Sequence, residues 1–250
     1  MALQEEFEKQ GNWLFKNRSV IPLIVVFAGI LVFIWTELHP ENYWLKNESF
    51  RHYYTWFCLL ISMIGLGIRV FTVGYTPANT SGRNTASQLA DSLNTTGIYS
   101  VVRHPLYLGN FFMWLGPVML TGQLWFVALV CFFYWIYYER IMFAEEQFLR
   151  RKFGEIYTSW ARGVPAFIPE WSKYVKPGLP FSWKKVLKKE KNGLVNVFAI
   201  FCVMDLVSVA IRKDNHFDFV LIGCTIITVL LYFVLKYLKY KTSLLNEEGR

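Results

Sequence analysis

Six hydrophobic segments constrain the fold of this chain more than any other feature of its sequence. A helix needs about 20 mostly apolar residues to cross a bilayer. Segments near that length lie at residues 19–36, 53–73, 106–120, 124–144, 194–211 and 217–235. Hydrophobic residues make up 54% of the chain, well above what an ordinary soluble domain contains. The sequence therefore predicts one integral domain over residues 1–250, an all-α, polytopic transmembrane helical bundle with about six spans.

The third and fourth hydrophobic segments are expected to form a tight helical hairpin. Only residues 121–123 separate them, and the third is short and interrupted by Gly116 and Pro117. A connection of this length makes two helices antiparallel neighbours. The residues just before the third segment should therefore lie beside those that end the fourth.

The distribution of basic residues predicts the orientation of the chain. Residues 145–193, between the fourth and fifth segments, hold 11 of the 26 Lys and Arg residues. Because cytoplasmic loops carry an excess of Lys and Arg, this segment is expected in the cytoplasm, and alternation of six spans puts both termini and the loop at 74–103 there too. No cleavable signal peptide is expected, since the N-terminal residues are acidic and polar.

An amphipathic helix is expected after the fourth segment. Phe148, Leu149, Phe153, Ile156, Tyr157 and Trp160 recur at helical spacing, with Arg150, Arg151 and Lys152 on the other face. This pattern is typical of a helix that lies on a membrane surface, here on the cytoplasmic side.

Charged residues converge at the predicted hairpin. Arg103, His104 and Pro105 stand at the start of the third segment, and Glu145 and Glu146 follow the fourth. A helix N-terminus beside a cation can bind an anion, and an acid opposite it can bind a cation. The combination suits a zwitterionic amino acid.

Each of these residues also has an ordinary structural explanation. Arg103 could extend to the interface, His104 could cap a helix, and the acidic pair could be solvated. Tyr99 and Tyr107 fit the aromatic belts of membrane proteins, although their rings could also stack on a base or surround a methylated cation. Only their convergence on one corner favours a functional site.

The four cysteines indicate neither a disulfide framework nor a metal centre. All lie inside hydrophobic segments, and none has the spacing of a zinc site. We therefore expect small buried side chains and no bound metal.

Two stretches resemble the isoprenylcysteine carboxyl methyltransferase and phospholipid methyltransferase superfamily. They are GIYSVVRHPLYLG at 97–109 and EEQFLRRKFGEIYTSWARGVPAFIP at 145–169. The family pattern is roughly GxYxxxRHPxYxG, a hydrophobic hairpin, an acidic pair ahead of FGxxYxxY, and a VPxxIP-like end. Trp160 replaces the last tyrosine of that pattern. The resemblance covers a core region at 93–169, and the segments at 194–235 form an additional C-terminal helix pair.

The resemblance implies S-adenosylmethionine as cofactor, bound from the cytoplasm, and a lipid substrate that enters from the bilayer. The residues that would contact the cofactor are Leu93, Asn94, Tyr99, His104, Pro105, Leu106, Tyr107, Gly109, Glu145 and Glu146. In the family an arginine before the acidic pair holds the acceptor. Arg140 stands one residue out of register with it, and Arg140 and Arg103 are the predicted catalytic residues.

The acceptor predicted by this reading is an anionic oxygen of a membrane lipid or lipidated molecule. A carboxylate or phosphate attacks a sulfonium methyl without deprotonation, whereas a lipid amine first needs a base. The candidate base, His104, would be occupied by the cofactor. A prenylcysteine carboxylate and a lipid phosphate, such as that of lipid A, both remain open, with Arg69 as a further orienting cation. Phosphatidylethanolamine N-methylation is the amine alternative.

Two other functions remain possible from the sequence. Membrane sterol reductases, which use a nicotinamide cofactor, resemble the same region, but Leu106 stands where they tend to have Asn and FAEE replaces their RDE-like end. A non-enzymatic scaffold or transporter is the second alternative, because Asp205 lies within a hydrophobic segment. No nucleic-acid partner is expected.

Overall fold

The computed structural model describes residues 2–42, 48–80 and 88–250. In these residues the chain forms helices and 3₁₀ turns, with one isolated bridge between Gly97 and Val175. The elements are α1 (Leu3–Lys16), α2 (Ile21–Leu38), η1 (Pro40–Asn42), α3 (Glu48–Tyr75), η2 (Ile98–Ser100), α4 (Pro105–Leu120), α5 (Leu124–Phe153), α6 (Glu155–Gly163), η3 (Trp171–Lys173), α7 (Trp183–Arg212) and α8 (Phe219–Lys241).

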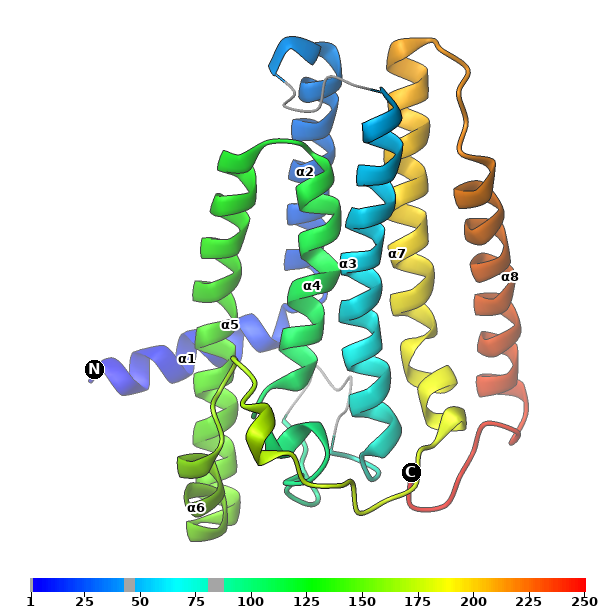
Figure 1. Cartoon of the computed structure of the whole chain (residues 1–250). Helices are drawn as coiled ribbons and strands as arrows, with labels where there is room; N and C mark the ends of the chain where they lie inside the picture. The colour runs from blue at the N-terminus through cyan, green and yellow to red at the C-terminus, as the bar shows by residue number, and fades with distance from the viewer. Residues whose placement is uncertain (1, 43–47, 81–87) are drawn as a thin grey trace.

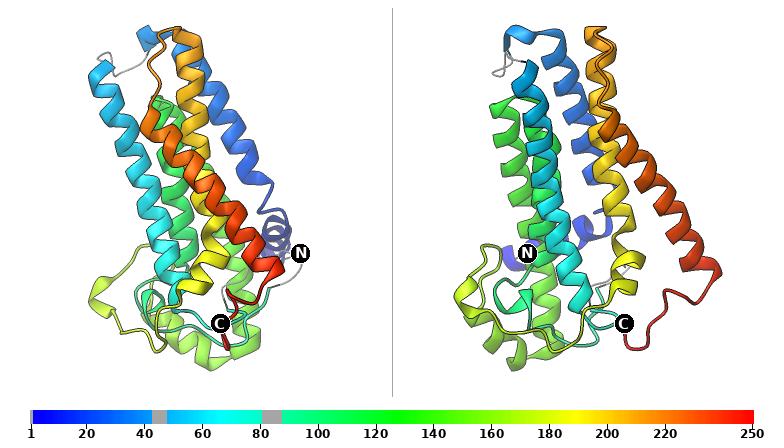
Figure 2. Two further views of the ribbon diagram at one scale, coloured as in Figure 1. Left: turned by 90° about the vertical axis from the view of Figure 1, so that its right-hand side faces the viewer. Right: turned by 45° about the vertical axis from the view of Figure 1, so that its right-hand side comes forward.

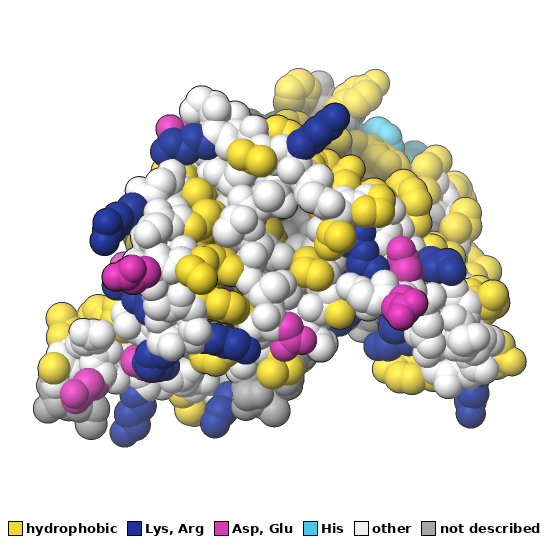
Figure 3. All heavy atoms as spheres, turned by 90° about the horizontal axis from the view of Figure 1, so that it is seen from below, with side chains coloured by type: hydrophobic (Ala, Val, Ile, Leu, Met, Phe, Trp, Pro, Cys, Tyr) yellow, Lys and Arg dark blue, Asp and Glu magenta, His cyan; other side chains and the backbone are white. Residues whose placement is uncertain are grey.

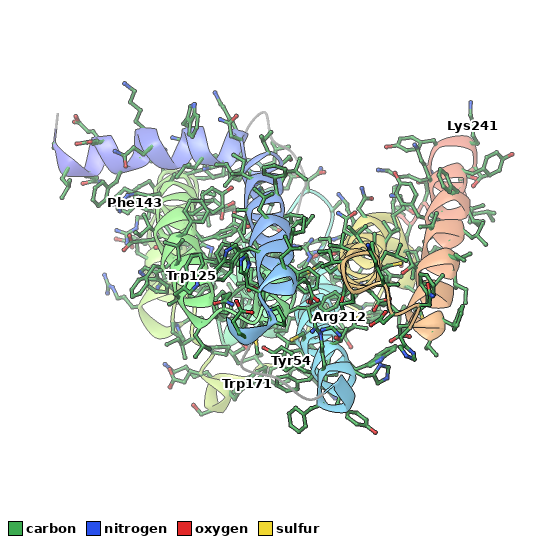
Figure 4. All side chains as sticks on the ribbon, turned by 90° about the horizontal axis from the view of Figure 1, so that it is seen from above. Tyr54, Trp125, Phe143, Trp171, Arg212 and Lys241 are labelled. Carbon is green, nitrogen blue, oxygen red and sulfur yellow. The ribbon has the colours of Figure 1, made fainter. Side chains whose placement is uncertain are left out.

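The long helices form an up-and-down bundle (Figures 1 and 2). α2, α4 and α7 run upward in Figure 1, α3, α5 and α8 run downward, and α1 lies across the lower half against α5. Figure 4, from above, shows α1 beside α5 near Phe143, whose ring meets Phe7 edge-on at 6.0 Å. The all-α polytopic fold is therefore confirmed.

Five of the described helices are long and apolar enough to cross a membrane: α2, α3, α5, α7 and α8. The remaining expected segment, the third, is also helical, but α4 has only 16 residues. At 1.5 Å per residue it rises about 24 Å, less than the roughly 30 Å of a hydrocarbon core. The α4–α5 turn accordingly lies below the upper ends of α2 and α7 in Figure 1.

The expected surface helix over residues 148–160 is wrong as a separate element. α5 continues without interruption from Leu124 through Phe153, because no helix breaker lies between them. The break comes at Gly154, whose φ of 54° is unfavourable for a side-chain-bearing residue. The predicted apolar face is thus divided between the end of α5 and α6.

The fifth expected segment begins eleven residues earlier than Leu194, at Trp183. Ser182 caps α7 by accepting a hydrogen bond from the Lys185 N–H at 3.1 Å. The basic run that marked the expected cytoplasmic loop is therefore the first three turns of α7. Viewed from below, this end of the bundle shows many Lys, Arg, Asp and Glu side chains interspersed with hydrophobic ones (Figure 3).

α3 and α4 pack closely through glycines. A Cβ on Gly65 would lie 2.4 Å from the Gly109 carbonyl oxygen, and one on Gly116 would lie 2.4 Å from the Cys58 carbonyl oxygen. Small residues allow such close approach of two membrane helices. This contact fixes the start of α4 against the end of α3, where the candidate site lies.

The Gly65→Ala variant should be destabilised by about 1–3 kcal/mol, because the new methyl meets backbone atoms that cannot move aside. The Gly67→Ala variant on the same helix is the control, since its methyl meets no atom within 4 Å. We expect thermal unfolding in detergent to show a lower midpoint for the first variant only. Equal midpoints would contradict the close packing.

Candidate functional site

A cleft of about 570 Å³, including its open mouth, lies at the lower end of the bundle. One wall comes from the end of α3, one from the chain leading into η2, and part of the rim from the segment before α7. Its lining residues are Thr72, Tyr75, Thr76, Pro77, Ser92, Leu93, Asn94, Thr95, Thr96, Ile98, Tyr99, Gly178 and Leu179. Polar groups and aromatic rings in one concave surface are typical of a small-molecule site.

Three of the predicted cofactor residues line this cleft: Leu93, Asn94 and Tyr99. The Asn94 side chain lies close enough to the Tyr99 phenol to interact with it. Burial, and then the nearby negative charge of Glu145, raises the pKa of the Tyr99 phenol far above its usual value. Tyr99 therefore stays protonated and can donate a hydrogen bond within the cleft.

The end of α3 is held in place by Lys185 of α7. Its ammonium donates to the carbonyl oxygens of Thr76 at 2.6 Å and Pro77 at 2.9 Å, and to the Thr76 hydroxyl at 2.9 Å. Carbonyls at a helix C-terminus lack partners within the helix, so a cation from a neighbouring element satisfies them. Sequence reasoning missed this contact because Lys185 is one of many lysines in a basic run.

The predicted acidic residues meet the start of α4. The Tyr107 hydroxyl donates to Glu145 Oε1 at 2.7 Å, and His104 Nε2 lies 3.1 Å from Glu146 Oε1. His104 Nδ1 is also 3.7 Å from Glu145 Oε2. Adjacent residues on a helix point about 100° apart, which is why the two carboxylates contact different groups. The hairpin therefore brings together the residues that the sequence suggested.

This acidic cluster adjoins the cleft through Tyr99. The phenol of Tyr99 lines the cleft and is close enough to Glu145 for the two to interact electrostatically. A molecule in the cleft that extends past Tyr99 would therefore approach the Glu145 carboxylate. Tyr99 is therefore the residue that links the cleft to the acidic cluster.

Arg103 contacts backbone carbonyl oxygens and a carboxylate of the chain itself. Its Nη1 donates to the carbonyl oxygens of Ala161 at 2.6 Å and Val164 at 3.1 Å, and its Nε lies 3.0 Å from Glu146 Oε1. The guanidinium thus fastens the end of α6 to the turn before α4. These contacts use the side chain as a structural cross-link rather than as a free catalytic group.

Two backbone N–H groups just before the N-terminus of α4 are not free to bind an anion. The N–H groups of Arg103 and His104 donate to the carbonyl oxygens of Pro165 at 2.9 Å and Ala166 at 3.2 Å. Both donors are therefore used within the chain. Of the other predicted cofactor residues here, Pro105 is buried, Leu106 is half-buried, and Gly109 packs against the Arg69 side chain.

Arg140 faces α1 instead of the acidic cluster. Its guanidinium carbon lies 3.4 Å from the centre of the Phe7 ring, and its Nη1 is 3.2 Å from Glu139 Oε2. A shift of one residue on a helix turns a side chain by about 100°. The one-residue difference from the family pattern therefore carries Arg140 to another face of α5, and its predicted catalytic role finds no support in these contacts.

A different cation, Arg18, lies near the cluster. Its guanidinium carbon is 3.8 Å from the centre of the Phe15 ring, and Phe15 packs with Tyr107 and Tyr137. The charge of Arg18 acts on the Tyr107 and Tyr137 hydroxyls and on Glu145. The sequence offered no signal for this placement, because the α1–α2 connection precedes the motif region by about 80 residues.

Comparisons with known proteins identify a matching family and several relatives. The model of the phospholipid methyltransferase family matches residues 56–156. The nickel-cobalt-cadmium resistance protein NccN of Alcaligenes xylosoxydans xylosoxydans is 32% identical over 123 residues, 48% of this chain and 55% of that protein. The chain thus spans about half the length of this relative.

Two further relatives have names that describe an enzyme. Protein-S-isoprenylcysteine O-methyltransferase B of Arabidopsis thaliana is 37% identical over 162 residues, 62% of this chain and 74% of that protein. Protein-S-isoprenylcysteine O-methyltransferase of Schizosaccharomyces pombe is 40% identical over 78 residues, 31% of this chain and 33% of that protein. No solved structure matches the chain.

Proposed function

Because this chain belongs to the isoprenylcysteine carboxyl methyltransferase and phospholipid methyltransferase superfamily, we propose that it transfers a methyl group from S-adenosylmethionine to a membrane lipid or lipidated acceptor. The observation that carries the proposal is the position of Tyr99, which lines the cleft beside Asn94 and lies near the Tyr107–Glu145 pair. The cofactor side of the membrane would be the cytoplasm, in keeping with the basic residues of 145–193.

The polar groups at the site suit S-adenosylmethionine. Glu145 offers a carboxylate for the ammonium of the methionine moiety, and Asn94 and the protonated Tyr99 offer hydrogen bonds for its polar groups. When bound, S-adenosylmethionine supplies an electrophilic sulfonium methyl. The chain's own residues hold it, fix its direction and exclude water, which are the contributions expected of a protein when the cofactor carries the chemistry.

An anionic oxygen is the acceptor that this site favours. His104 lies between two carboxylates and is 3.1 Å from Glu146, so it is engaged and not available as a base for a lipid amine. A prenylcysteine carboxylate or a lipid phosphate needs no deprotonation before attack. Phosphatidylethanolamine would require a base that the contacts at this cluster do not provide.

Arg18 and Tyr137 are the groups best suited to orient this acceptor. The charge of Arg18 acts on Glu145 from the α1–α2 connection, and the Arg18 guanidinium lies over the ring of Phe15, which packs with Tyr137. The Tyr137 hydroxyl is buried and has no hydrogen-bond partner among the described residues, and a buried polar group of this kind needs an explanation. An acceptor oxygen would supply the missing partner.

The Arg18→Gln variant should raise the acceptor KM about tenfold, the value of one charge-assisted hydrogen bond, and leave the affinity for S-adenosylhomocysteine unchanged. The control is Arg151→Gln, which removes an equal charge from an exposed pair with Glu8. Initial-rate kinetics on vesicles would separate the two variants. Equal acceptor KM values would refute the role of Arg18.

Two measurements test the proposed function. Transfer of labelled methyl from S-adenosylmethionine into a total lipid extract, followed by identification of the labelled species, should reveal the acceptor. Thermal shift of the solubilised protein should show stabilisation by S-adenosylhomocysteine and none by NADPH. Stabilisation by NADPH alone would favour a reductase. Stabilisation by neither would favour the scaffold or transporter, although Asp205 already accepts a hydrogen bond from the Asp218 N–H at 3.3 Å.

A further inference from the structure

A buried ion pair joins α7 to α3 just above the cleft. Arg69 donates from Nε to Glu190 Oε2 at 2.8 Å and from Nη2 to Glu190 Oε1 at 2.7 Å. The side chains are 14% and 4% exposed, respectively. Two parallel hydrogen bonds between a guanidinium and a carboxylate fix the orientation of both groups.

The guanidinium also contacts α4 and, through Asn110, α5. Arg69 Nη1 donates to Asn110 Oδ1 at 2.7 Å, and Asn110 Nδ2 donates to the Tyr138 hydroxyl at 3.1 Å. Asn110 lies one turn along α4 from Tyr107. On α3, Arg69 lies one turn before Thr72, which lines the cleft. One cation therefore sets the register of α3, α4 and α5 at the level of the site.

A contribution to stability does not by itself explain the buried Arg69–Glu190 ion pair. Replacing a buried ion pair by apolar side chains of similar volume is often neutral or stabilising, and ionisable groups within a membrane segment are usually functional. α7 also has a second attachment at the opposite end of the bundle. There Glu37 of α2 forms ion pairs with Arg51 and with Arg212 of α7, and Figure 4 shows Arg212 on the side of α7 that faces α2 and α3.

We propose that Glu190 is a positioning residue of the methyl-transfer site, acting through Arg69. The inference rests on the proposed function and extends the site beyond residues 56–156, which the family model matches. Glu190 neutralises Arg69 and holds it against Asn110, so that α3 and α4 keep their relative positions at the level of Thr72 and Tyr107. The additional helix α7 is thereby part of the catalytic unit.

The first test compares two variants that each weaken one attachment of α7. Glu190→Gln should lower kcat about tenfold or more, the effect of a site displaced by a fraction of an ångström to an ångström, with weaker binding of S-adenosylhomocysteine and an acceptor KM within about twofold of the wild-type value. Glu37→Gln removes a similarly buried carboxylate at the far end and should leave kcat within about twofold. Equal kcat values for the two variants would overturn the proposal.

A double variant separates positioning from folding. Arg69→Met with Glu190→Met replaces the pair by apolar side chains, so its thermal midpoint should stay close to that of the wild-type protein while its kcat remains at least about tenfold reduced. Recovery of kcat in the double variant would show that the pair serves packing alone and would overturn the proposal. A wild-type chain that does not bind S-adenosylhomocysteine would instead refute the proposed function, and the inference with it.

Discussion

The Glu145→Gln variant should bind S-adenosylhomocysteine at least about 30-fold more weakly than the wild-type protein. Glu145 accepts a hydrogen bond from Tyr107 and presents its charge to Tyr99 at the edge of the cleft. Removing one partner of a desolvated charge pair costs about 2–5 kcal/mol, and each 1.4 kcal/mol is about tenfold in affinity. Because Gln keeps the volume of Glu, the loss should reflect charge and not packing.

Calorimetry on the purified protein would measure this affinity directly. Glu139→Gln, in which the substituted carboxylate is half exposed and pairs with Arg140 on the same helix, is the matched control. We expect it to bind as tightly as the wild-type protein. An unchanged affinity in Glu145→Gln, with the fold retained, would remove Glu145 from the cofactor site.

The Arg103→Met variant should be destabilised by about 3 kcal/mol and lose methyl transfer. The substitution leaves the carbonyl oxygens of Ala161 and Val164 and the carboxylate of Glu146 without their cation. Breaking a buried pair from one side costs about 3–5 kcal/mol, and the lower end applies here because the Arg103 side chain is 19% exposed.

Thermal unfolding and activity, measured on the same preparation, test the cross-link made by Arg103. Arg103→Lys should recover little of the midpoint, because one ammonium cannot reproduce the planar guanidinium contacts. Arg162→Met removes an exposed arginine of α6 and should unfold like the wild-type protein. An Arg103→Met variant of normal stability but no activity would instead restore the predicted catalytic role of Arg103.

Local patterns predicted the helices and the hairpin well. The three residues at 121–123 permit only antiparallel neighbours, so the approach of Tyr107 to Glu145 followed from chain connectivity. The predicted helix boundaries were less accurate where a polar segment is helical. The basic run before residue 194 is helical because Ser182 caps it and Lys185 reaches α3, and no local pattern contains either contact.

The carboxylate partners of three arginines could not be predicted from the sequence. From the sequence, Arg140 and Arg103 are the predicted catalytic residues, and Arg69 is a further cation that could orient an acceptor. In the structure they pair with Glu190, Glu146 and Glu139, respectively. The partner of Arg69 lies 121 residues away, so its choice depends on which face of α7 meets α3.

The sequence by itself determined the membrane-spanning α-helical class, the hairpin and the family motif, because hydrophobic length, turn length and motif spacing are local properties of the chain. Only the tertiary structure decided which carboxylates pair with Arg69, Arg103 and Arg140, and that Arg18 lies near the acidic cluster. These outcomes depend on the rotation and close approach of helices distant in sequence. Packing of small residues such as Gly65 and Gly109 sets that approach.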